Sequence, residues 1–174
     1  HGVDLGPLEP RVPEILRTPS GRIELCPEPI AAQVATMEPE PPEPNTFVVI
    51  GRRHLRTNNS WMHNVPALVK GRPLCTLVVN RGDAQRLGLS AGGQARVTSR
   101  VGEVKLTVEV TDDIAPGVVS IPHGFGHDLP GVELSVARQA PPGVNTNLLT
   151  DDLRVDPLSG NAVLNGIPVE VAPA

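Results

Sequence analysis

The chain has 174 residues, which is enough for one domain of moderate size with a real hydrophobic core. Hydrophobic residues make up 39% of it and aromatic residues only 2%, so aliphatic side chains must fill that core, and the branched ones favour β structure. The net charge of -4 argues against a general nucleic-acid binder, and no apolar run reaches the roughly 20 residues of a membrane-spanning helix.

Residues 1–46 are predicted to be an extended connector from preceding domains. They hold half of the prolines and show no sustained hydrophobic periodicity. The Pro/Glu-rich run at residues 38–44 should be extended and solvated, because proline fixes φ and the carboxylates repel one another. Residues 20–25 alternate like a short strand that could dock on the body. The folded body is expected to span residues 47–174.

The first half of the body is predicted to contain two strands and a short helix. Buried-strand patterns cover residues 47–50 and residues 74–79. The stretch between them, residues 52–64, is too rich in Asn and Ser for a helix. Asn80 can cap a short helix after the second strand, and Gly88 marks its exit.

Further strands are predicted at residues 95–100, 104–110 and 118–121, and apolar residues alternate most clearly along the middle one. The Asn-Gly pair at residues 165–166 lies between two apolar runs and predicts a hairpin, in which Pro168 confines the second strand to a sheet edge. Several short strands with one or two short helices imply a mainly β fold, namely a closed or nearly closed β-barrel.

The cysteines and the start of the chain give expectations for disulfide bonding and for the cellular compartment. Cys26 and Cys75 lie far apart and match no zinc or redox spacing, so we expect two buried or half-buried thiols rather than a disulfide. The first residues mix charge, Gly and Pro and show no signal-peptide pattern. The chain begins with His1 rather than Met, which suggests a fragment of a longer protein, although a processed or trimmed terminus would look identical. We expect that protein in the cytoplasm, with the periplasm as the alternative.

A basic loop follows the first predicted strand directly, so its side chains should emerge at a barrel mouth. It contains Arg52, Arg53 and Arg56 without an intervening acidic residue. Arginine forks fit phosphate oxygens in a bidentate manner, and Asn and Ser can bond phosphate, sugar or heterocycle edges. Charge alone would favour a merely solvated loop. The asparagines, Ser60 and Trp61 beside the arginines favour an anion-binding loop instead.

Two further polar loops are candidates. Residues 123–127 place two glycines between two histidines, and glycine lets a flat ligand approach the backbone, whereas a zinc site would need more ligands. Residues 143–152 form a polar loop that its composition alone marks as an ordinary connection. The adjacent carboxylates at residues 112–113 and 151–152 suit turns. No nucleophile elbow, phosphate-binding loop or dinucleotide-type glycine pattern occurs, so nothing commits the chain to catalysis.

Eight short segments stand in a specific order and spacing. They are Thr-Pro-Ser-Gly-Arg-Ile-Glu-Leu at 18–25, Gly-Arg-Arg at 51–53, Asn-Ser-Trp at 59–61, the stretches at 80–89, 92–93 and 145–149, His-Gly at 123–124, and Asp-Pro-Leu-Ser-Gly at 156–160. Together they resemble the last domain of the molybdopterin oxidoreductases of the dimethyl sulfoxide reductase type, a group that includes formate dehydrogenases and nitrate reductases. The resemblance covers nearly the whole chain except the Pro/Glu-rich run.

This resemblance implies a double-psi β-barrel that closes over two molybdopterin guanine dinucleotides, whose dithiolenes hold molybdenum or tungsten. In family members the loop after the first barrel strand contributes cofactor contacts, as do the His-Gly and late Asn loops. The residues to which the resemblance gives this cofactor-binding role are Gly51, Arg52, Arg53, Arg56, Asn58, Asn59, Ser60, His123, Gly124, Asn145 and Asn147.

The metal's protein ligand and any iron–sulfur cysteines belong to earlier domains of the family, and Cys26 and Cys75 match no such motif. The resemblance therefore implies a carboxy-terminal domain that is not catalytic, and holds no cofactor, when isolated. The implied partners are upstream domains of the same polypeptide and an electron-transfer subunit or iron–sulfur cluster in the parent, with no nucleic acid and no membrane segment.

Two other functions stay open at this point. A double-psi barrel can serve as a protein-interaction module, because one fold hosts unrelated functions. The basic Arg/Asn/Ser loop argues against this, since interaction surfaces more often present apolar and aromatic anchors. A hydrolase with an Asp pair would need a repeated Asp-Thr/Ser-Gly-like motif, and the sequence has none.

Overall fold

A computed structural model of the protein describes residues 2–37, 46–141 and 143–174. The contacts within the chain divide it into two compact units, His1–Glu40 and Pro41–Ala174. The extended Pro/Glu-rich run predicted at residues 38–44 lies outside the described residues. None of the helices in the described part has the length and apolar character needed to span a membrane.

The first unit contains a helix that the sequence analysis did not predict, α1 at Glu28–Ala35, which begins directly after Pro27. The short strand predicted at residues 20–25 is wrong, because this stretch forms bends. Gly21 has a left-handed φ of 64°, and the Thr18 hydroxyl donates to the Arg22 carbonyl at 2.7 Å. Such local bonds turn the chain back on itself instead of offering its main chain to a partner strand.

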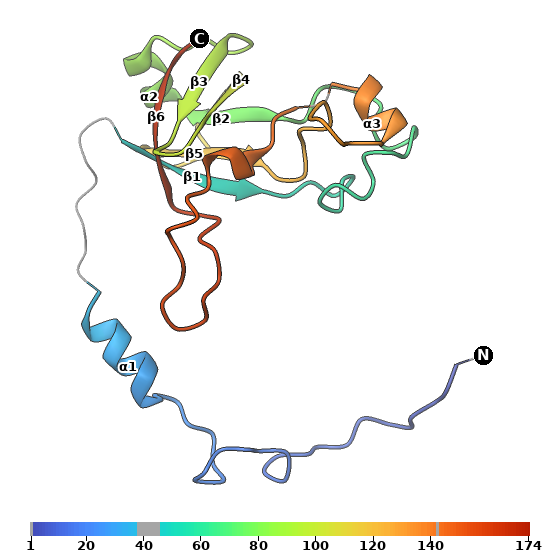
Figure 1. Cartoon of the computed structure of the whole chain (residues 1–174), viewed down its shortest axis with the longest axis vertical. Coiled ribbons are helices and arrows are strands. Elements are labelled where there is room, and N and C mark those ends of the chain that lie inside the picture. Colours follow the sequence, from blue (N-terminus) through green and yellow to red (C-terminus); the bar gives the residue numbers. More distant parts are fainter. Residues whose placement is uncertain (1, 38–45, 142) are drawn as a thin grey trace. The chain divides into compact units, whose positions relative to one another are not determined.

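The second unit is a closed barrel of six strands in the order β1-β5-β2-β4-β3-β6 (Figure 1). Strands β1 and β5 pair in parallel, as do β2 and β4, while the remaining pairs are antiparallel. This is the double-psi β-barrel that the sequence led us to expect, and the mainly β prediction is confirmed. The strands are β1 Phe47–Arg52, β2 Thr76–Asn80, β3 Gln94–Thr98, β4 Glu103–Thr111, β5 Val118–Pro122 and β6 Ile167–Pro173.

The described part of this unit also contains three short helices: α2 at Arg81–Leu87, α3 at Ser135–Gln139 and the 3-10 helix η1 at Thr146–Leu149. Helix α2 begins and ends as predicted. The Asn80 side chain accepts a hydrogen bond from the Gly82 amide at 2.9 Å, and Gly88 ends the helix with a left-handed φ of 69°. The prediction of this helix is confirmed at both ends.

Aliphatic side chains that alternate along the strands fill the barrel. Leu149 of η1 is also fully buried in this core. Burying each such side chain contributes on the order of 1.5–3 kcal/mol, so the apolar alternation of the strands is sufficient reason for the barrel to close. The largest fully buried residues are Phe47, Leu77, Ile121, Leu149, Val79, Val97, Val119 and Pro122.

The hairpin predicted around residues 165–166 is wrong. Residues 162–164 form no strand, and the nearest pairing is an isolated bridge between Val155 and Ala162. Strand β6 instead pairs with β1 and with β3 and closes the barrel, so it is no sheet edge. Pro168 lies opposite Val48 in the part of β6 that pairs with β1 alone, so its missing N–H removes no bond toward β3.

Both cysteines are free thiols. Cys75 is partly buried beside the core, as expected, whereas Cys26 is exposed and the expectation for it is wrong. Cys26 belongs to the first unit, whose described residues bury little apolar surface around it.

The loops that follow β1 and β5 lie at one end of the barrel. Figure 1 shows residues 53–75 and the segment that carries α3 at this end, away from α2. Three of the predicted polar segments therefore start from the same rim of the barrel.

Candidate functional site

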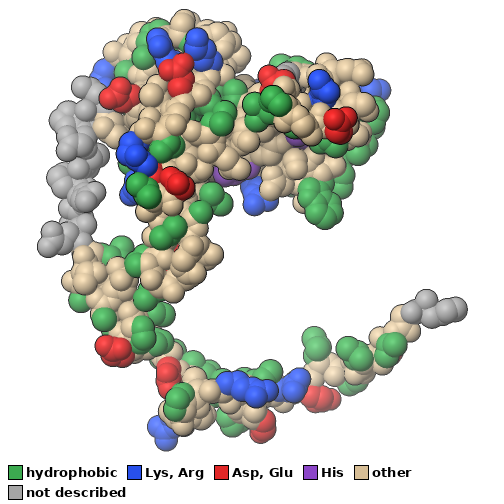
Figure 2. Space-filling model, in the orientation of Figure 1, with side chains coloured by type: hydrophobic (Ala, Val, Ile, Leu, Met, Phe, Trp, Pro, Cys, Tyr) green, Lys and Arg blue, Asp and Glu red, His purple; other side chains and the backbone are tan. Residues whose placement is uncertain are grey.

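An open groove of about 540 Å³ lies where the three predicted loops meet. The basic loop, the loop after β5 and the segment before η1 each contribute polar side chains to it. None of the described residues that line it is acidic. In Figure 2, histidine side chains lie at a hollowed part of the barrel unit beside a basic side chain. The predicted site residues in the groove are Arg53, Asn59, Ser60, His123, Gly124, Asn145 and Asn147.

Glycines allow these loops to approach one another closely. Gly124 has a φ of 89°, and a β-carbon on it would lie 2.6 Å from the carbonyl carbon and oxygen of Asn59. Gly126 has a φ of 98°, and a β-carbon there would lie 2.8 Å from the backbone nitrogen of Asn145. Both the left-handed conformation and the short distance exclude other residues without strain. These two glycines set how tightly the groove's walls meet.

Gly51 accommodates the imidazole of His123 at the floor of this region. A β-carbon on Gly51 would lie only 2.0 Å from Nε2 of His123. The Gly51 amide donates to Oδ1 of Asn165 at 2.6 Å, and Nδ1 of His123 lies 3.2 Å from the Thr146 hydroxyl. His123 is thereby held between the end of β1 and the start of η1.

The electrostatics of the groove favour an anionic ligand. Burial lowers the pKa of His123, and the positive charge of Arg53 lowers it further, so the imidazole is neutral near pH 7. A neutral imidazole offers one donor and one acceptor. Within the described part of the chain the Arg53 guanidinium has no ion pair or hydrogen bond, so its donors are free for a ligand.

Two consecutive asparagines shape the basic loop. Asn58 and Asn59 have φ values of 40° and 61°, a left-handed conformation that Asn adopts more readily than most residues. The bend brings Asn59 and Ser60 to the groove and leaves Asn58 outside its lining. Trp61 is 80% exposed next to it.

The three arginines of the basic loop differ in position and in hydrogen-bond partners. Arg53, the first residue after β1, lines the groove, whereas Arg52, the last residue of β1, does not. The Arg52 guanidinium donates to the carbonyls of Ser120 and Thr76 at 3.3 and 3.1 Å, and burial lowers its pKa. Arg56 donates to the Ala67 carbonyl at 3.1 Å and lies outside the groove as well. These two arginines stabilise the loop through hydrogen bonds to main-chain carbonyls outside the groove.

Several groove residues had no cofactor-binding role assigned from the sequence. Phe125, His127 and Thr146 lie inside the candidate loops 123–127 and 143–152, but only neighbouring residues of those loops were assigned that role. Leu164, by contrast, comes from the stretch that was expected to form a hairpin, and no local signal identifies it. The apolar part of the wall consists of Leu129, Val132, Leu134 and Leu164.

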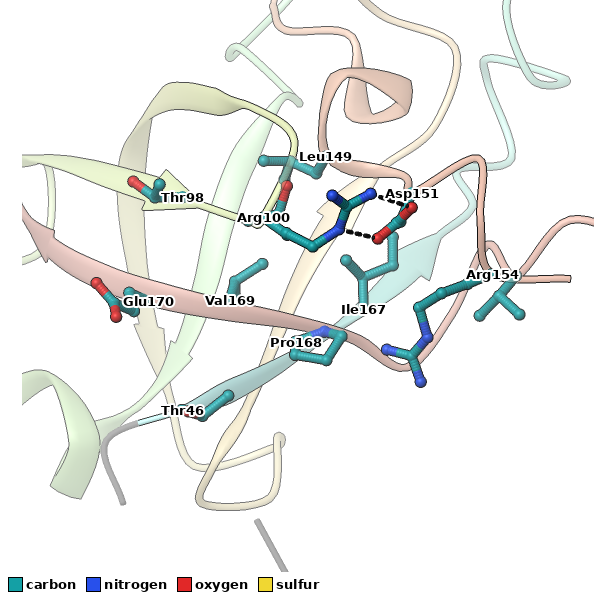
Figure 3. Close-up of a pocket in the computed structure, with 12 residues that line it drawn as sticks. Thr46, Thr98, Arg100, Leu149, Asp151, Arg154, Ile167, Pro168, Val169 and Glu170 are labelled. Atoms are coloured by element: carbon teal, nitrogen blue, oxygen red, sulfur yellow. Dashed lines mark hydrogen bonds and ion pairs between the residues drawn. The ribbon is translucent and has the colours of Figure 1, made fainter. Parts of the chain in front are cut away.

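A second groove, of about 490 Å³, runs along β6 and contains its own counter-charges. Figure 3 shows the Arg100 guanidinium directed at the Asp151 carboxylate, with N–O distances of 2.5 and 2.6 Å, and Arg154 nearby. This guanidinium lowers the pKa of Asp151 to about 2. Since Asp151 and Glu170 balance the two arginines, this groove suits an anionic ligand less well than the first.

No group of three or more His, Cys, Asp or Glu residues in the described ranges could hold a metal ion. The groove's donors are arginine, amide, hydroxyl and imidazole groups, which match phosphate oxygens and heterocycle edges rather than a bare cation.

The family described as "Molydopterin dinucleotide binding domain" matches residues 47–168, which include strands β1 to β5 and the start of β6. The chain belongs to this family. The match covers every predicted site residue and most of the barrel. Its ligand class, a molybdopterin dinucleotide, agrees with a groove that is rich in donors and free of described acidic residues.

Curated relatives place the domain in the dimethyl sulfoxide reductase type, as the sequence resemblance indicated. One subunit of the tetrathionate reductase of Salmonella typhimurium is 30% identical over 123 residues, which are 62% of this chain and 12% of the relative. A putative dimethyl sulfoxide reductase chain, YnfE of Escherichia coli, is 30% identical over 134 residues, which are 65% of this chain and 16% of the relative. The chain thus spans less than a fifth of the curated relatives that it matches.

The barrel also has a counterpart among solved structures. Acetylene hydratase from Pelobacter acetylenicus superposes with a TM-score of 0.61 at 23% sequence identity, over 74% of this chain and 18% of that one. At this identity the likeness shows a shared fold.

Proposed function

We propose that this chain is the dinucleotide-holding part of a larger molybdenum or tungsten oxidoreductase, and that the groove between the three loops binds the phosphates and guanine of molybdopterin guanine dinucleotide. The observation that carries the proposal is the groove itself. It combines an unpaired Arg53, several amide and hydroxyl donors, and no acidic side chain among its described lining residues.

The donor set fits the parts of such a ligand. Arg53 can hold phosphate oxygens through its guanidinium fork. Asn59, Ser60, Asn145 and Asn147 offer both donors and acceptors, as a purine edge requires. Neutral His123 adds one of each without placing a second positive charge beside Arg53. The apolar wall can cover the flat faces of a heterocycle.

When bound, the cofactor supplies the dithiolene sulfurs that carry the metal. The described residues contain no cluster that could add a set of metal ligands. Because the chain spans less than a fifth of its curated relatives, we assign the metal's protein ligand, the reacting substrate and any electron-transfer partner to other parts of the parent protein. The role of this chain is to bind the cofactor's outer portion and to orient it.

The test uses the full-length gene product, expressed anaerobically with molybdate and tungstate available, and measures bound metal and released guanine nucleotide per chain. Metal with about two guanines per chain is expected, because the cofactor of this family pairs two dinucleotides on one metal. Arg53→Ala should weaken retention roughly tenfold to hundredfold, since a charge-assisted hydrogen bond contributes about 1.5–3 kcal/mol.

Arg96→Ala is the matched control. Arg96 is an exposed arginine on β3 and lines neither of the two grooves, so its removal should leave the guanine content unchanged. A folded parent protein that contains neither metal nor guanine would overturn the proposal and favour a protein-interaction module. Unchanged guanine content in Arg53→Ala would remove the role assigned to that residue.

A further inference from the structure

Two buried histidines connect the basic loop to the loop after β5. His63 lies in the stretch between β1 and β2, and His127 follows the His-Gly motif. Nδ1 of His63 and Nε2 of His127 lie 2.6 Å apart, and the rings meet edge to face at 87°. Only 4% of His63 and 7% of His127 is exposed. The two side chains thus form a short, buried hydrogen bond between two walls of the groove.

The surroundings of the pair are poor in compensating charge. The Phe125 ring lies 4.3 Å from the His63 ring, and the other nitrogen of His63, Nε2, is buried without a hydrogen-bond partner among the described residues. The cationic side chains of Arg56 and Arg72 line the same small cavity as the pair. A second positive charge placed there would be poorly hydrated and offset only in part, by Asp128.

The short distance limits the pair to one bridging proton. An N–H···N hydrogen bond needs one nitrogen that donates and one that accepts. If both histidines are fully protonated, two N–H groups must face each other across 2.6 Å, and the contact cannot persist. The pair is therefore compatible with one added charge at most.

We propose that the His63–His127 pair positions the basic loop against the loop after β5, and that a second proton on the pair releases the two loops from each other. Only the effect of the pair on ligand binding rests on the proposed function. The pair can affect the groove because Asn59 and Ser60 of the basic loop line it and His127 lines it as well. The same contact would then make retention of the dinucleotide dependent on pH.

Burial lowers the pKa of both imidazoles, and the neighbouring His127 lowers that of His63 further. His54 also lowers the pKa of His63, whereas a main-chain hydrogen bond with Gly124 raises it. The carboxylate of Asp128 raises the pKa of His127 and so opposes the effect of burial. Histidines of an open loop would take up protons near the ordinary value of 6.5. The pair's contribution is therefore complete above pH 6.5 and is lost as the pH falls below it.

Trp61 provides a built-in reporter, because it is the single tryptophan of the chain and lies two residues before His63. Its fluorescence in this chain, without cofactor, should show a reversible transition below pH 6.5 while circular dichroism shows the barrel intact. His127→Gln keeps a neutral side chain that can hydrogen-bond and cannot become charged, so the transition should disappear. His54→Gln removes another histidine of the same loop outside the pair and should keep the transition.

NMR titration of the histidine rings in the unaltered chain tests the same point without a variant. The titrations of His63 and His127 should be coupled to each other and should lie below pH 6.5. Independent titration of both near 6.5, or an unchanged fluorescence transition in His127→Gln, would overturn the inference. The full-length gene product should also release guanine nucleotide over the same pH range. If the chain shows the transition and the gene product contains no guanine, the proposed function fails while the histidine pair retains its role.

Discussion

Gly126 lies so close to Asn145 that a β-carbon on Gly126 would come within 2.7 Å of the Asn145 β-carbon. This contact joins the loop after β5 to the segment before η1, and both belong to the groove. The absence of a side chain at one position therefore decides how two distant segments of the chain meet. Its consequence can be measured directly.

Replacing Gly126 by alanine should destabilise this chain and weaken cofactor retention. The left-handed φ of 98° costs about 1–3 kcal/mol for a residue with a side chain, and the clash with Asn145 adds to that. Urea unfolding measures the change. Gly131→Ala is the control, because Gly131 has a similar φ of 86° and open space around it. Equal losses in the two variants would show that the contact with Asn145 is unimportant.

Gly51 and His123 should behave as a coupled pair. In Gly51→Ala the new methyl group must displace the imidazole, whose Nε2 lies 2.0 Å from the position it would occupy, so we expect a loss of about 1–3 kcal/mol. In the double variant with His123→Ala the methyl group has room. The double variant should therefore lose less than the sum of the two single variants, by about 0.5–3 kcal/mol. Strict additivity in denaturant unfolding would contradict this.

The ion pair between Arg100 and Asp151 should make part of the free energy of unfolding depend on pH in the acidic range. Because Arg100 lowers the pKa of Asp151 from 3.8 to about 2, the carboxylate's contribution is complete above pH 3.8 and is lost as the pH falls through about 2. Asp151→Asn should therefore lower the thermal midpoint at neutral pH, and its difference from the unaltered chain should shrink in acid. Asp112→Asn, at an ion pair exposed on both sides, should change the midpoint less.

This chain by itself should bind guanosine diphosphate weakly. The groove is open, so part of the ligand's surface stays in water unless other segments cover it. NMR titration should show a dissociation constant above the micromolar range, with shifts at His123 and Asn145, and Arg53→Ala should weaken binding about tenfold or more. Sub-micromolar binding would show that the chain forms a complete site without other domains.

The elements that the sequence predicted well are those whose structure depends on residues close together in the chain. Asn80 and Gly88 bound α2 because a cap needs only one side chain and the next turn of main chain. The strands followed from apolar alternation, and the double-psi barrel from the order of short motifs. The three loops of the groove could likewise be named in advance, because each follows a recognisable strand or carries its own motif.

What the sequence could not show depends on residues far apart in the chain. Strand β6 pairs with β1 and β3 rather than with residues 162–164, which precede it in the chain. In the closed barrel the main-chain groups of β6 form hydrogen bonds on both of its sides, whereas a hairpin would satisfy only one side. Arg52 and Arg53 look equivalent in the sequence, yet only Arg53 lines the groove, because the Arg52 guanidinium is held by carbonyls of β2 and β5.

The local sequence of this protein thus determined helix α2, the apolar alternation of the barrel strands and the chemical character of the loops. The tertiary structure alone decided which side chains face one another. The His63–His127 hydrogen bond exists because the barrel brings the β1–β2 and β5–β6 connections to one rim, and the contact between Gly126 and Asn145 exists because the β5–β6 connection folds back on itself. Such contacts are set by packing in three dimensions, for which neighbouring residues in the chain carry no signal.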